Sequence, residues 1–173
     1  AFSFLKDGQT VSFGGSMTLE DTGMLTALRH DPGITLLDRA QAKTPEETKK
    51  IYHDALSSDF YFMSTNAITK DGELVNIDGT GNRVAALIYG PEHVIVMAGM
   101  NKVAANVDEA LSRVHGTATP MNCKRLGKNT PCSATGVCSD CLSPDCICNQ
   151  VVITRRSGIE GRIKVILIGE ELG

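Results

Sequence analysis

The sequence predicts an α/β fold in which helices cover a mostly parallel β-sheet. Short apolar segments with strand character alternate with amphipathic helical segments through residue 115, glycine-rich turns separate them, and 42% of the residues are hydrophobic. With 173 residues the chain can enclose a core, so we expect one domain over residues 1–173 with a cysteine-rich loop at residues 120–149. The first strand opens close to residue 1, so we also expect a further segment to precede it.

The first half of the chain contains three strand segments and two helix starts. Ser16 or Thr18 can cap a short helix whose first turn is acidic. Thr44, Pro45 and Glu47 combine a capping residue, a proline at the first helical position and the glutamate of a capping box, which predicts a second helix start. The predicted strands are residues 11–13, 34–37 and 59–64.

The second half contains a hairpin, two helices and three further strands. Residues 67–69 and 74–77 flank a turn at residues 70–72 and predict the hairpin. Residues 151–155 and 164–168 are expected to pair with each other around residues 157–161. The remaining elements are a helix at residues 83–89, a strand at 94–98 and a helix at 107–114.

All six cysteines lie within residues 123–148. A disulfide scaffold would spread them along the chain, whereas clustering in a cytosolic protein favours metal or redox chemistry. Cys138 and Cys141 form a C-x2-C pair, which on a tight turn brings both sulfurs to one metal. Cys146 is the alternative to Cys148 as fourth ligand, and Cys123 is interpreted as a core residue. The predicted metal ligands are Cys132, Cys138, Cys141 and Cys148.

Three interpretations of the cysteine loop remain open. Structural Zn²⁺ is the simplest, but zinc ribbons usually contain two C-x2-C pairs and this loop contains one. The C-x5-C-x2-C-x6-C spacing is similar, in spacing only, to the single iron–sulfur loop of DNA glycosylases, so we favour a [4Fe-4S] cluster over Zn²⁺. Free or disulfide-bonded thiols are the third interpretation.

Small polar residues gather in the turns beside the predicted strands. In an open α/β sheet, the loops at the carboxyl ends of the strands converge on one crevice, so we predict a shared site for a small anionic metabolite. Glycines let backbone N–H groups approach such a ligand, and Arg83 and Lys102 are candidate anion partners. For any single residue, ordinary turn chemistry is the alternative. The candidate ligand-binding residues are Gly14, Gly15, Ser16, Thr18, Thr65, Asn66, Asp78, Gly79, Gly81, Asn82, Arg83, Asn101 and Lys102.

Composition argues against several classes of partner. No apolar run approaches the roughly 20 residues that span a bilayer, and no signal peptide is recognisable, so we expect a cytoplasmic protein without membrane association. A net charge of −3 does not indicate a nucleic-acid partner. The four histidines form no metal or nucleophile pattern, and Ser16 lacks a recognisable base, which disfavours a hydrolase triad.

Three motifs, at residues 14–23, 64–91 and 131–149, together resemble the lactate-utilisation (LUD) family over nearly the whole chain. The resemblance implies a fold similar to the ribose-phosphate isomerase/CoA-transferase group. Through LutC-type members it also implies a part in oxidising lactate to pyruvate alongside iron–sulfur partner subunits. CoA-transferases use a nucleophilic glutamate, but the neighbours of Glu73 do not match that motif. The resemblance therefore supplies no catalytic residue.

Three hypotheses follow. In the leading one, the protein is a subunit of an organic-acid (lactate) oxidation or electron-transfer system whose cysteine loop holds a metal or an iron–sulfur cluster. In the second, it is a binding protein or a transferase- or isomerase-like enzyme for a sugar phosphate or CoA ester, and the metal is structural. In the third, it is a regulatory or assembly protein that senses redox state through its thiols. We allow for a homo-oligomer in each case.

Overall fold

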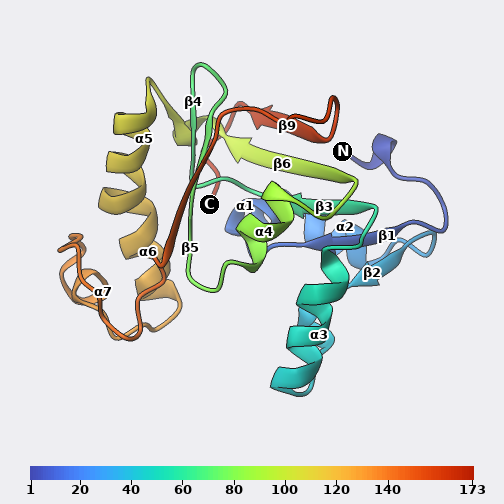
Figure 1. Cartoon of the computed structure of the whole chain (residues 1–173), viewed down its shortest axis with the longest axis horizontal. Coiled ribbons are helices and arrows are strands. Elements are labelled where there is room, and N and C mark those ends of the chain that lie inside the picture. Colours follow the sequence, from blue (N-terminus) through green and yellow to red (C-terminus); the bar gives the residue numbers. More distant parts are fainter. The chain divides into compact units, whose positions relative to one another are not determined.

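A computed structural model describes residues 1–173, and the chain divides into two compact units (Figure 1). Unit 1 comprises Ala1–Ser64, Ala85–Asn101 and Ser157–Gly173. Unit 2 comprises Thr65–Val84 and Lys102–Arg156. Helix α4, Asn82–Ile88, and the 3₁₀ turn η3, Met100–Lys102, begin in one unit and end in the other.

Unit 1 is built on a five-stranded sheet in which every pair of neighbouring strands is parallel. The strand order is β2 (Thr35–Leu37), β1 (Thr10–Phe13), β3 (Phe60–Met63), β6 (His93–Gly99) and β9 (Ile163–Ile168). This sheet and its helices confirm the predicted α/β class. Because the strands are parallel, the turns that follow β1, β3 and β6 lie at the same edge of the sheet.

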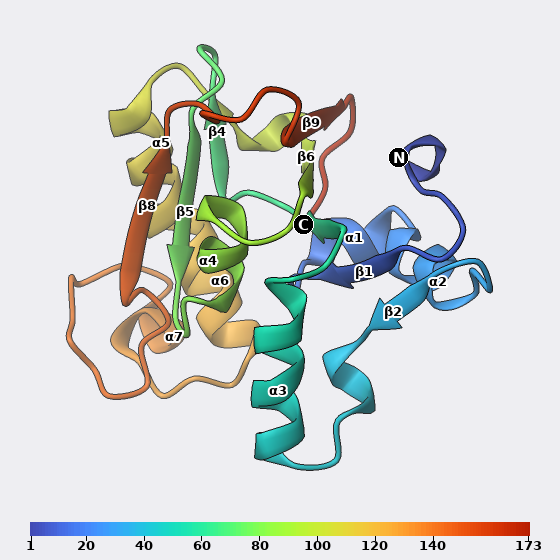
Figure 2. The same cartoon turned by 45° about the vertical axis from the view of Figure 1, so that its right-hand side comes forward.

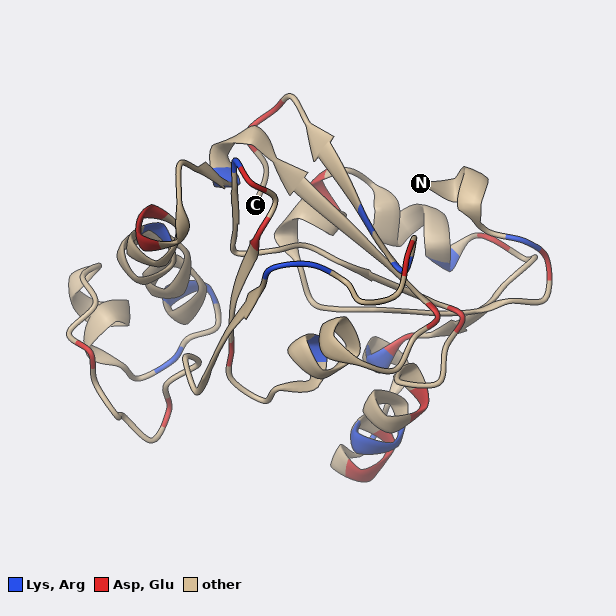
Figure 3. Cartoon of the chain, turned by 45° about the horizontal axis from the view of Figure 1, so that its top comes forward, with Lys and Arg blue, Asp and Glu red and all other residues tan.

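The helices of unit 1 begin where the sequence places capping residues. Thr44 Oγ1 accepts a hydrogen bond from Glu47 N, and the Glu47 carboxylate accepts one from Lys43 N, so α3 opens on a reciprocal cap. Ser16 also caps its helix, α1 (Met17–Asp21), by accepting from Leu19 N, but without a reciprocal bond. The helical elements of unit 1 are η1 (Phe2–Phe4), α1 (Met17–Asp21), α2 (Met24–Arg29), η2 (Arg39–Gln41) and α3 (Pro45–Ala55). Acidic and basic residues are intermixed on α3 (Figure 3).

The core of unit 1 lies between its sheet and helices α1 and α2. Alternate residues of β1, β3 and β6 meet Leu19, Leu25 and Leu28, which the two short helices contribute. Because consecutive strand residues point to opposite faces, these three strands each supply buried side chains to this layer. The buried cluster consists of Val11, Phe13, Leu19, Met24, Leu25, Leu28, Phe60, Phe62, Ile95 and Met97.

Unit 2 contains a four-stranded mixed sheet and a helical segment. The strand order is β7 (Val103–Ala104), β4 (Ala67–Thr69), β5 (Leu74–Asp78) and β8 (Gln150–Thr154). The β4–β5 hairpin was predicted and is confirmed, with antiparallel pairing. The helices are α5 (Val107–Arg113), the π-helical turn η4 (Val114–Ala118), α6 (Thr119–Arg125) and α7 (Pro131–Thr135).

Two predictions about the C-terminal part are wrong. Residues 151–155 and 164–168 do not pair with each other: β8 pairs antiparallel with β5, and β9 pairs parallel with β6 (Figure 2). β6 is a largely buried seven-residue strand, and its second edge pairs with β9 over six residues. The region predicted as loop from residue 120 also contains α6 and α7, because η4 widens the helix ahead of Pro120 and Thr130 caps α7.

No helix of the structure has the length and apolar character needed to cross a membrane.

Arg162 anchors the start of β9 inside unit 1. Its side chain is 6% exposed and donates to the carbonyl oxygens of Ala86, Leu87 and Pro91 at 2.8, 2.7 and 3.0 Å. Two of these carbonyls belong to the last turn of α4, which has no further helical donors for them. Burial lowers the pKa of Arg162.

Replacing Arg162 with methionine is expected to lower the free energy of unfolding by about 3 kcal/mol, because buried carbonyls lose a charged donor. Urea denaturation measures the change. Arg155, which is exposed, is the matched control, and Arg155→Met should leave stability within about 0.5 kcal/mol. Equal stability of the two variants would show that the carbonyl contacts of Arg162 carry no weight.

Candidate functional site

The strand ends of unit 1 bring several predicted ligand residues to one edge, but hydrogen bonds within the unit already use some of them. Ser16 Oγ accepts from Leu19 N at 3.4 Å as the cap of α1. Ser64 Oγ, just after β3, donates to Thr18 Oγ1 at 3.2 Å, and both side chains are buried. Ser16 and Thr18 therefore act locally as turn and cap residues, the alternative that the sequence left open.

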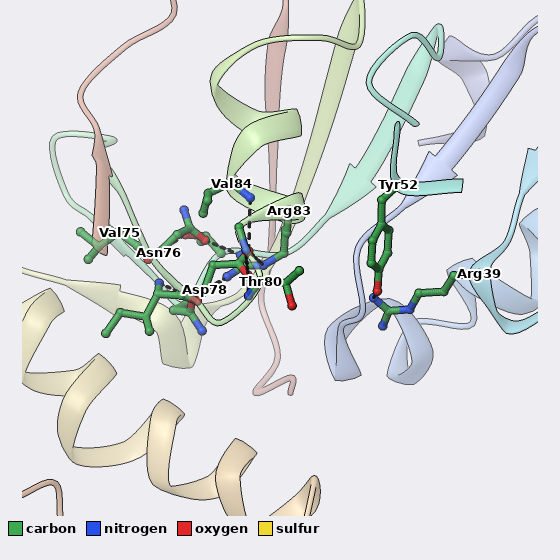
Figure 4. Close-up of polar contacts among 12 residues, drawn as sticks. Arg39, Tyr52, Val75, Asn76, Asp78, Thr80, Arg83 and Val84 are labelled. Carbon is green, nitrogen blue, oxygen red and sulfur yellow. Dashed lines mark hydrogen bonds and ion pairs between the residues drawn. The ribbon is translucent and has the colours of Figure 1, made fainter. Parts of the chain in front are cut away.

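Arg39 lies directly over Gly15, a contact that sequence reasoning missed. A β-carbon on Gly15 would lie 2.2 Å from Arg39 Nη2, so a side chain there would displace the guanidinium from its present position. Arg39 Nη1 faces Tyr52 Oη at 3.4 Å (Figure 4). No carboxylate is paired with Arg39, which leaves its guanidinium with only this long contact to a hydroxyl.

At the end of β6, the C-terminal segment occupies the polar groups of the turn. Asn101 Oδ1 accepts from Leu172 N at 3.2 Å, and Met100 N donates to Glu170 O at 3.0 Å. The space beside Gly99 is filled by Glu170 O and Leu172 N, each less than 3 Å from where a β-carbon would be. The Asn101 amide thus holds this segment in place. Lys102, the neighbouring candidate, is buried and has a partner in the protein.

In unit 2, residues 78–83 form a turn that we name the glycine turn. The Asp78 carboxylate accepts from Thr80 N at 3.1 Å, Gly81 N at 2.9 Å and Val84 N at 3.3 Å (Figure 4). The Asp78 carboxylate therefore caps the first turn of α4 and places a negative charge at the N-terminus of this helix. An anionic ligand at these amides would have to displace Asp78, so this turn does not offer the predicted anion site.

Arg83 is held by acceptors within unit 2. Its Nη1 donates to Asn76 Oδ1 at 2.6 Å, and its Nη2 donates to Asn66 Oδ1 at 3.0 Å and Ile77 O at 2.7 Å (Figure 4). Nε lies 3.7 Å from Asp78 Oδ2. The structure does bring Asn66, Asp78 and Arg83 together, as the sequence suggested, but they bind one another and fix β4 to β5.

The polar side chain before β4 is also used within this network. Thr65 Oγ1 donates to Ala67 O at 2.8 Å and Val75 O at 3.2 Å, and Thr65 is buried. Arg113 of α5 donates to Asn66 O at 2.7 Å. Thr65 and Asn66 are therefore parts of the frame of unit 2.

The six cysteines, all free thiols, fall into two sets. Cys123 and Cys132 form a buried pair between α6 and α7, with Thr130 Oγ1 3.4 Å from Cys132 Sγ. Burial, followed by the neighbouring Cys132 thiol, raises the pKa of Cys123. Cys132 was predicted as a metal ligand, and the structure places it with Cys123.

The second set, which we name the four-cysteine group, contains Cys138, Cys141, Cys146 and Cys148. Burial, with contributions from the other three thiols, raises the pKa of Cys148 to about 11. His115 of η4 joins the group, with Nδ1 3.5 Å from Cys138 Sγ. Cys146, which the sequence left as the alternative fourth ligand, thus lies with Cys148.

The donor set of the four-cysteine group fits a thiophilic metal, because four sulfurs are the ligands of structural zinc and of cubane clusters. No three His, Cys, Asp or Glu side chains already converge closely enough to hold an ion. The four cysteines lie within eleven residues of chain and are only partly buried.

An ion pair closes the base of the cysteine loop. Lys128 Nζ lies 2.9 Å from Asp145 Oδ1, and Asn129 N donates to Asp145 Oδ2 at 2.7 Å. The Lys128 hydrogen bond, followed by the Asn129 amide, lowers the pKa of Asp145. Ser143 Oγ adds a bond to Asn129 O at 3.2 Å. The chain that carries Cys138 and Cys141 is thus tied into a ring.

The last part of the cysteine loop packs on the glycine turn. A β-carbon on Gly79 would lie 3.2 Å from Ile147 Cα, so the two backbones are in close contact. Asn149 Nδ2 donates to Gly79 O at 2.9 Å, and Cys146 Sγ donates to Asn149 Oδ1 at 3.0 Å. Two motifs that the sequence treats separately are therefore in contact within unit 2.

Comparison with known proteins gives one family match. A model of the LUD domain matches residues 2–168 of this chain. A search of curated proteins gives no match.

Several solved structures show limited similarity. A DUF162 family protein from Deinococcus radiodurans has 12% identity and a TM-score of 0.40, over 94% of this chain and 88% of that one. Ribose 5-phosphate isomerase from Plasmodium falciparum has 14% identity and a TM-score of 0.35, over 60% and 48%. A chain of the tetrameric eIF2B-beta2-delta2 complex from C. thermophilum has 21% identity and a TM-score of 0.37, over 61% and 40%. This chain thus spans less than half the length of that eIF2B chain.

Proposed function

The chain belongs to the LUD domain family, and on that premise we propose that it is a lactate-utilisation-type protein whose four-cysteine group holds a metal centre. The observation that carries the proposal is that Cys138, Cys141, Cys146 and Cys148 lie within eleven residues of one loop, with His115 Nδ1 3.5 Å from Cys138 Sγ. Thiolate sulfur selects zinc and iron–sulfur clusters over hard cations.

If the centre is a [4Fe-4S] cluster, it gives the protein a part in electron transfer. If the centre is Zn²⁺, its role is to stabilise the structure of the loop. We favour the cluster because it suits the electron-transfer role that family membership suggests; the cysteine spacing that favoured a cluster included Cys132 and does not extend to this set. The Lys128–Asp145 ion pair supports either group, because it holds the ends of the loop together before a metal binds. His115 beside Cys138 can donate a hydrogen bond to a bound thiolate and so tune it.

At the level of the pathway, we propose that the protein works as a subunit in the oxidation of an organic acid such as lactate, together with iron–sulfur partner subunits. This part of the proposal rests on family membership. A cytoplasmic location, also proposed, suits it because a reducing compartment keeps the four thiols available for a metal.

The test is the metal and labile-sulfide content of anaerobically purified protein, with its visible spectrum. Iron and sulfide in equal amounts, with brown colour, are expected. Zinc without sulfide would remove the electron-transfer role and leave a structural centre. Protein that is fully folded and contains neither metal would sink the proposal.

A second candidate function, binding of a small anionic metabolite by unit 1, is favoured by one observation. Arg39 presents a guanidinium without an acidic partner over Gly15, at the edge where β1 and β3 end. A carboxylate or phosphate is the natural partner of such a group. Arg39→Ala should abolish thermal shifts caused by lactate or ribose 5-phosphate, and this candidate fails if neither compound shifts the melting temperature of the wild type.

A further inference from the structure

We propose that β9 is a dimerisation edge: it pairs antiparallel with β9 of a second copy of this chain and joins the two unit 1 sheets into one. β9 forms one edge of its sheet, with β6 on one side and no strand on the other (Figure 1). This dimer goes beyond the proposed function and does not depend on the metal centre.

The outer side of β9 carries a row of backbone groups without partners. Arg162 O, just before the strand, accepts from Val94 N of β6 at 2.8 Å, so the backbone groups of the even-numbered residues of β9 face β6. Those of Ile163, Val165 and Leu167 therefore point away from the sheet, and no hydrogen bond to another segment uses them. Such a row is a template for a further strand.

β9 lacks the features by which edge strands usually avoid pairing. The opposite edge of the same sheet, β2, is three residues long, whereas β9 has six residues, with no proline and one charged residue. That residue, Lys164, directs its ammonium back to the start of the strand, where it donates to Gly161 O and lies 3.3 Å from His93 Nδ1. The open edge is therefore left without a charged guard.

The exposed side chains of β9 are apolar and fit a copy of themselves. Val165 and Leu167 lie on the same face of the sheet and are 40% and 51% exposed. Because the odd-numbered residues carry the outward backbone groups, an antiparallel partner must bring odd residues opposite odd residues. The register that pairs Val165 with the second copy's Leu167 also forms the reciprocal pair, with Ile166 on the two-fold axis. Four apolar side chains then cover one another.

The charges at the two ends of β9 favour the antiparallel arrangement. Lys164 stands near the start of the strand, and Glu170 and Glu171 follow its end. Antiparallel pairing places the start of each strand beside the end of the other, so each ammonium comes near the glutamates of the other copy. Parallel pairing would instead set the glutamates of both copies side by side. The partner that this edge fits is therefore a second copy related by a two-fold axis.

Sedimentation velocity of the full chain, kept reduced and free of oxygen so that its thiols form no disulfides, measures the association. At about 100 µM most wild-type chains are expected as dimers, and at about 1 µM as monomers, as suits a small interface. Leu167→Lys should weaken the dimer at least about tenfold, because each copy then brings a charge into the pairing. The matched control is Val151→Lys. Val151 is also 51% exposed on an edge strand, β8, and this variant should dimerise as the wild type does.

Hydrogen exchange of the wild type shows which strand forms the contact, and it serves even if Leu167→Lys fails to fold. The amides of Val165 and Leu167 should exchange about tenfold more slowly at the higher concentration, and those of β8 at an unchanged rate.

Monomers at every concentration would overturn the proposal, and so would a dimer that survives Leu167→Lys but is lost in Val151→Lys. A dimer in which the Val165 and Leu167 amides gain no protection would place the contact elsewhere and overturn it as well. None of these results bears on the metal centre, which is judged by metal content.

Discussion

Replacing Arg83 with methionine is expected to lower the free energy of unfolding by about 4 kcal/mol, because the loss leaves several buried acceptors without a donor. Asn76 is fully buried and its Nδ2 has no partner, so Arg83 supplies the bond that its side chain makes. Ile77 O and Asn66 Oδ1 lose a donor at the same time. Denaturation in urea, followed by circular dichroism, measures the loss.

Arg39→Met is the control for this prediction. Arg39 makes one 3.4 Å contact and no ion pair, so its replacement should change stability by less than about 1 kcal/mol. Measuring Arg83→Met beside Arg39→Met also separates two roles that Arg83 could have, which are to hold unit 2 together and to bind an anion. If Arg83→Met were as stable as the wild type and lost affinity for an anion, Arg83 would be a ligand-binding residue and our account of the unit 2 network would be wrong.

The second large effect is expected in metal content. Cys141→Ser and Cys148→Ser should each lower the metal bound per chain at least about tenfold, because a thiolate ligand is replaced by a hydroxyl that stays protonated. Cys146→Ser should do the same. Metal analysis of each anaerobically purified variant gives the result.

Cys132→Ser and Cys123→Ser are the matched controls, because both residues lie in the same loop region but are the two buried cysteines, next to each other. They should keep the metal and lose stability by about 1 kcal/mol, as a hydroxyl replaces a buried thiol. Loss of metal in Cys132→Ser with retention in Cys146→Ser would restore the ligand set that the spacing suggested and contradict the one we propose.

Most of unit 1 is predictable from sequence because its signals are local. Thr44 and Pro45 fix the start of α3, and the apolar runs that become β1 and β3 have no alternative to burial. The pairing of β9 with β6 was not predictable in this way. The sequence of a strand indicates that it will join a sheet, but not which strand it will pair with. β9 pairs with β6, about 70 residues earlier in the chain, so no local signal identifies the partner.

The candidate site was predicted in part, for a related reason. The polar residues Asn66, Asp78 and Arg83 do come together. The sequence alone could not show that Arg83 makes its hydrogen bond and ion pair with the other two rather than with a ligand. Nothing in the sequence marks Arg39 as a site residue, because an arginine shortly after a strand is common. Its position beside Gly15 is known only from the fold. Spacing likewise could not decide between Cys146 and Cys148 as fourth ligand, and it gave no sign that α7 places Cys132 beside Cys123.

The central claim is that four cysteine sulfurs hold one metal centre, and X-ray absorption at the edge of the bound metal tests it most directly. The account predicts that the wild-type protein, purified without oxygen, shows a first shell of sulfur atoms at about 2.3 Å, with no nitrogen or oxygen shell of comparable weight. For iron, a second shell of neighbouring iron atoms should accompany it. A first shell dominated by nitrogen or oxygen would contradict the claim.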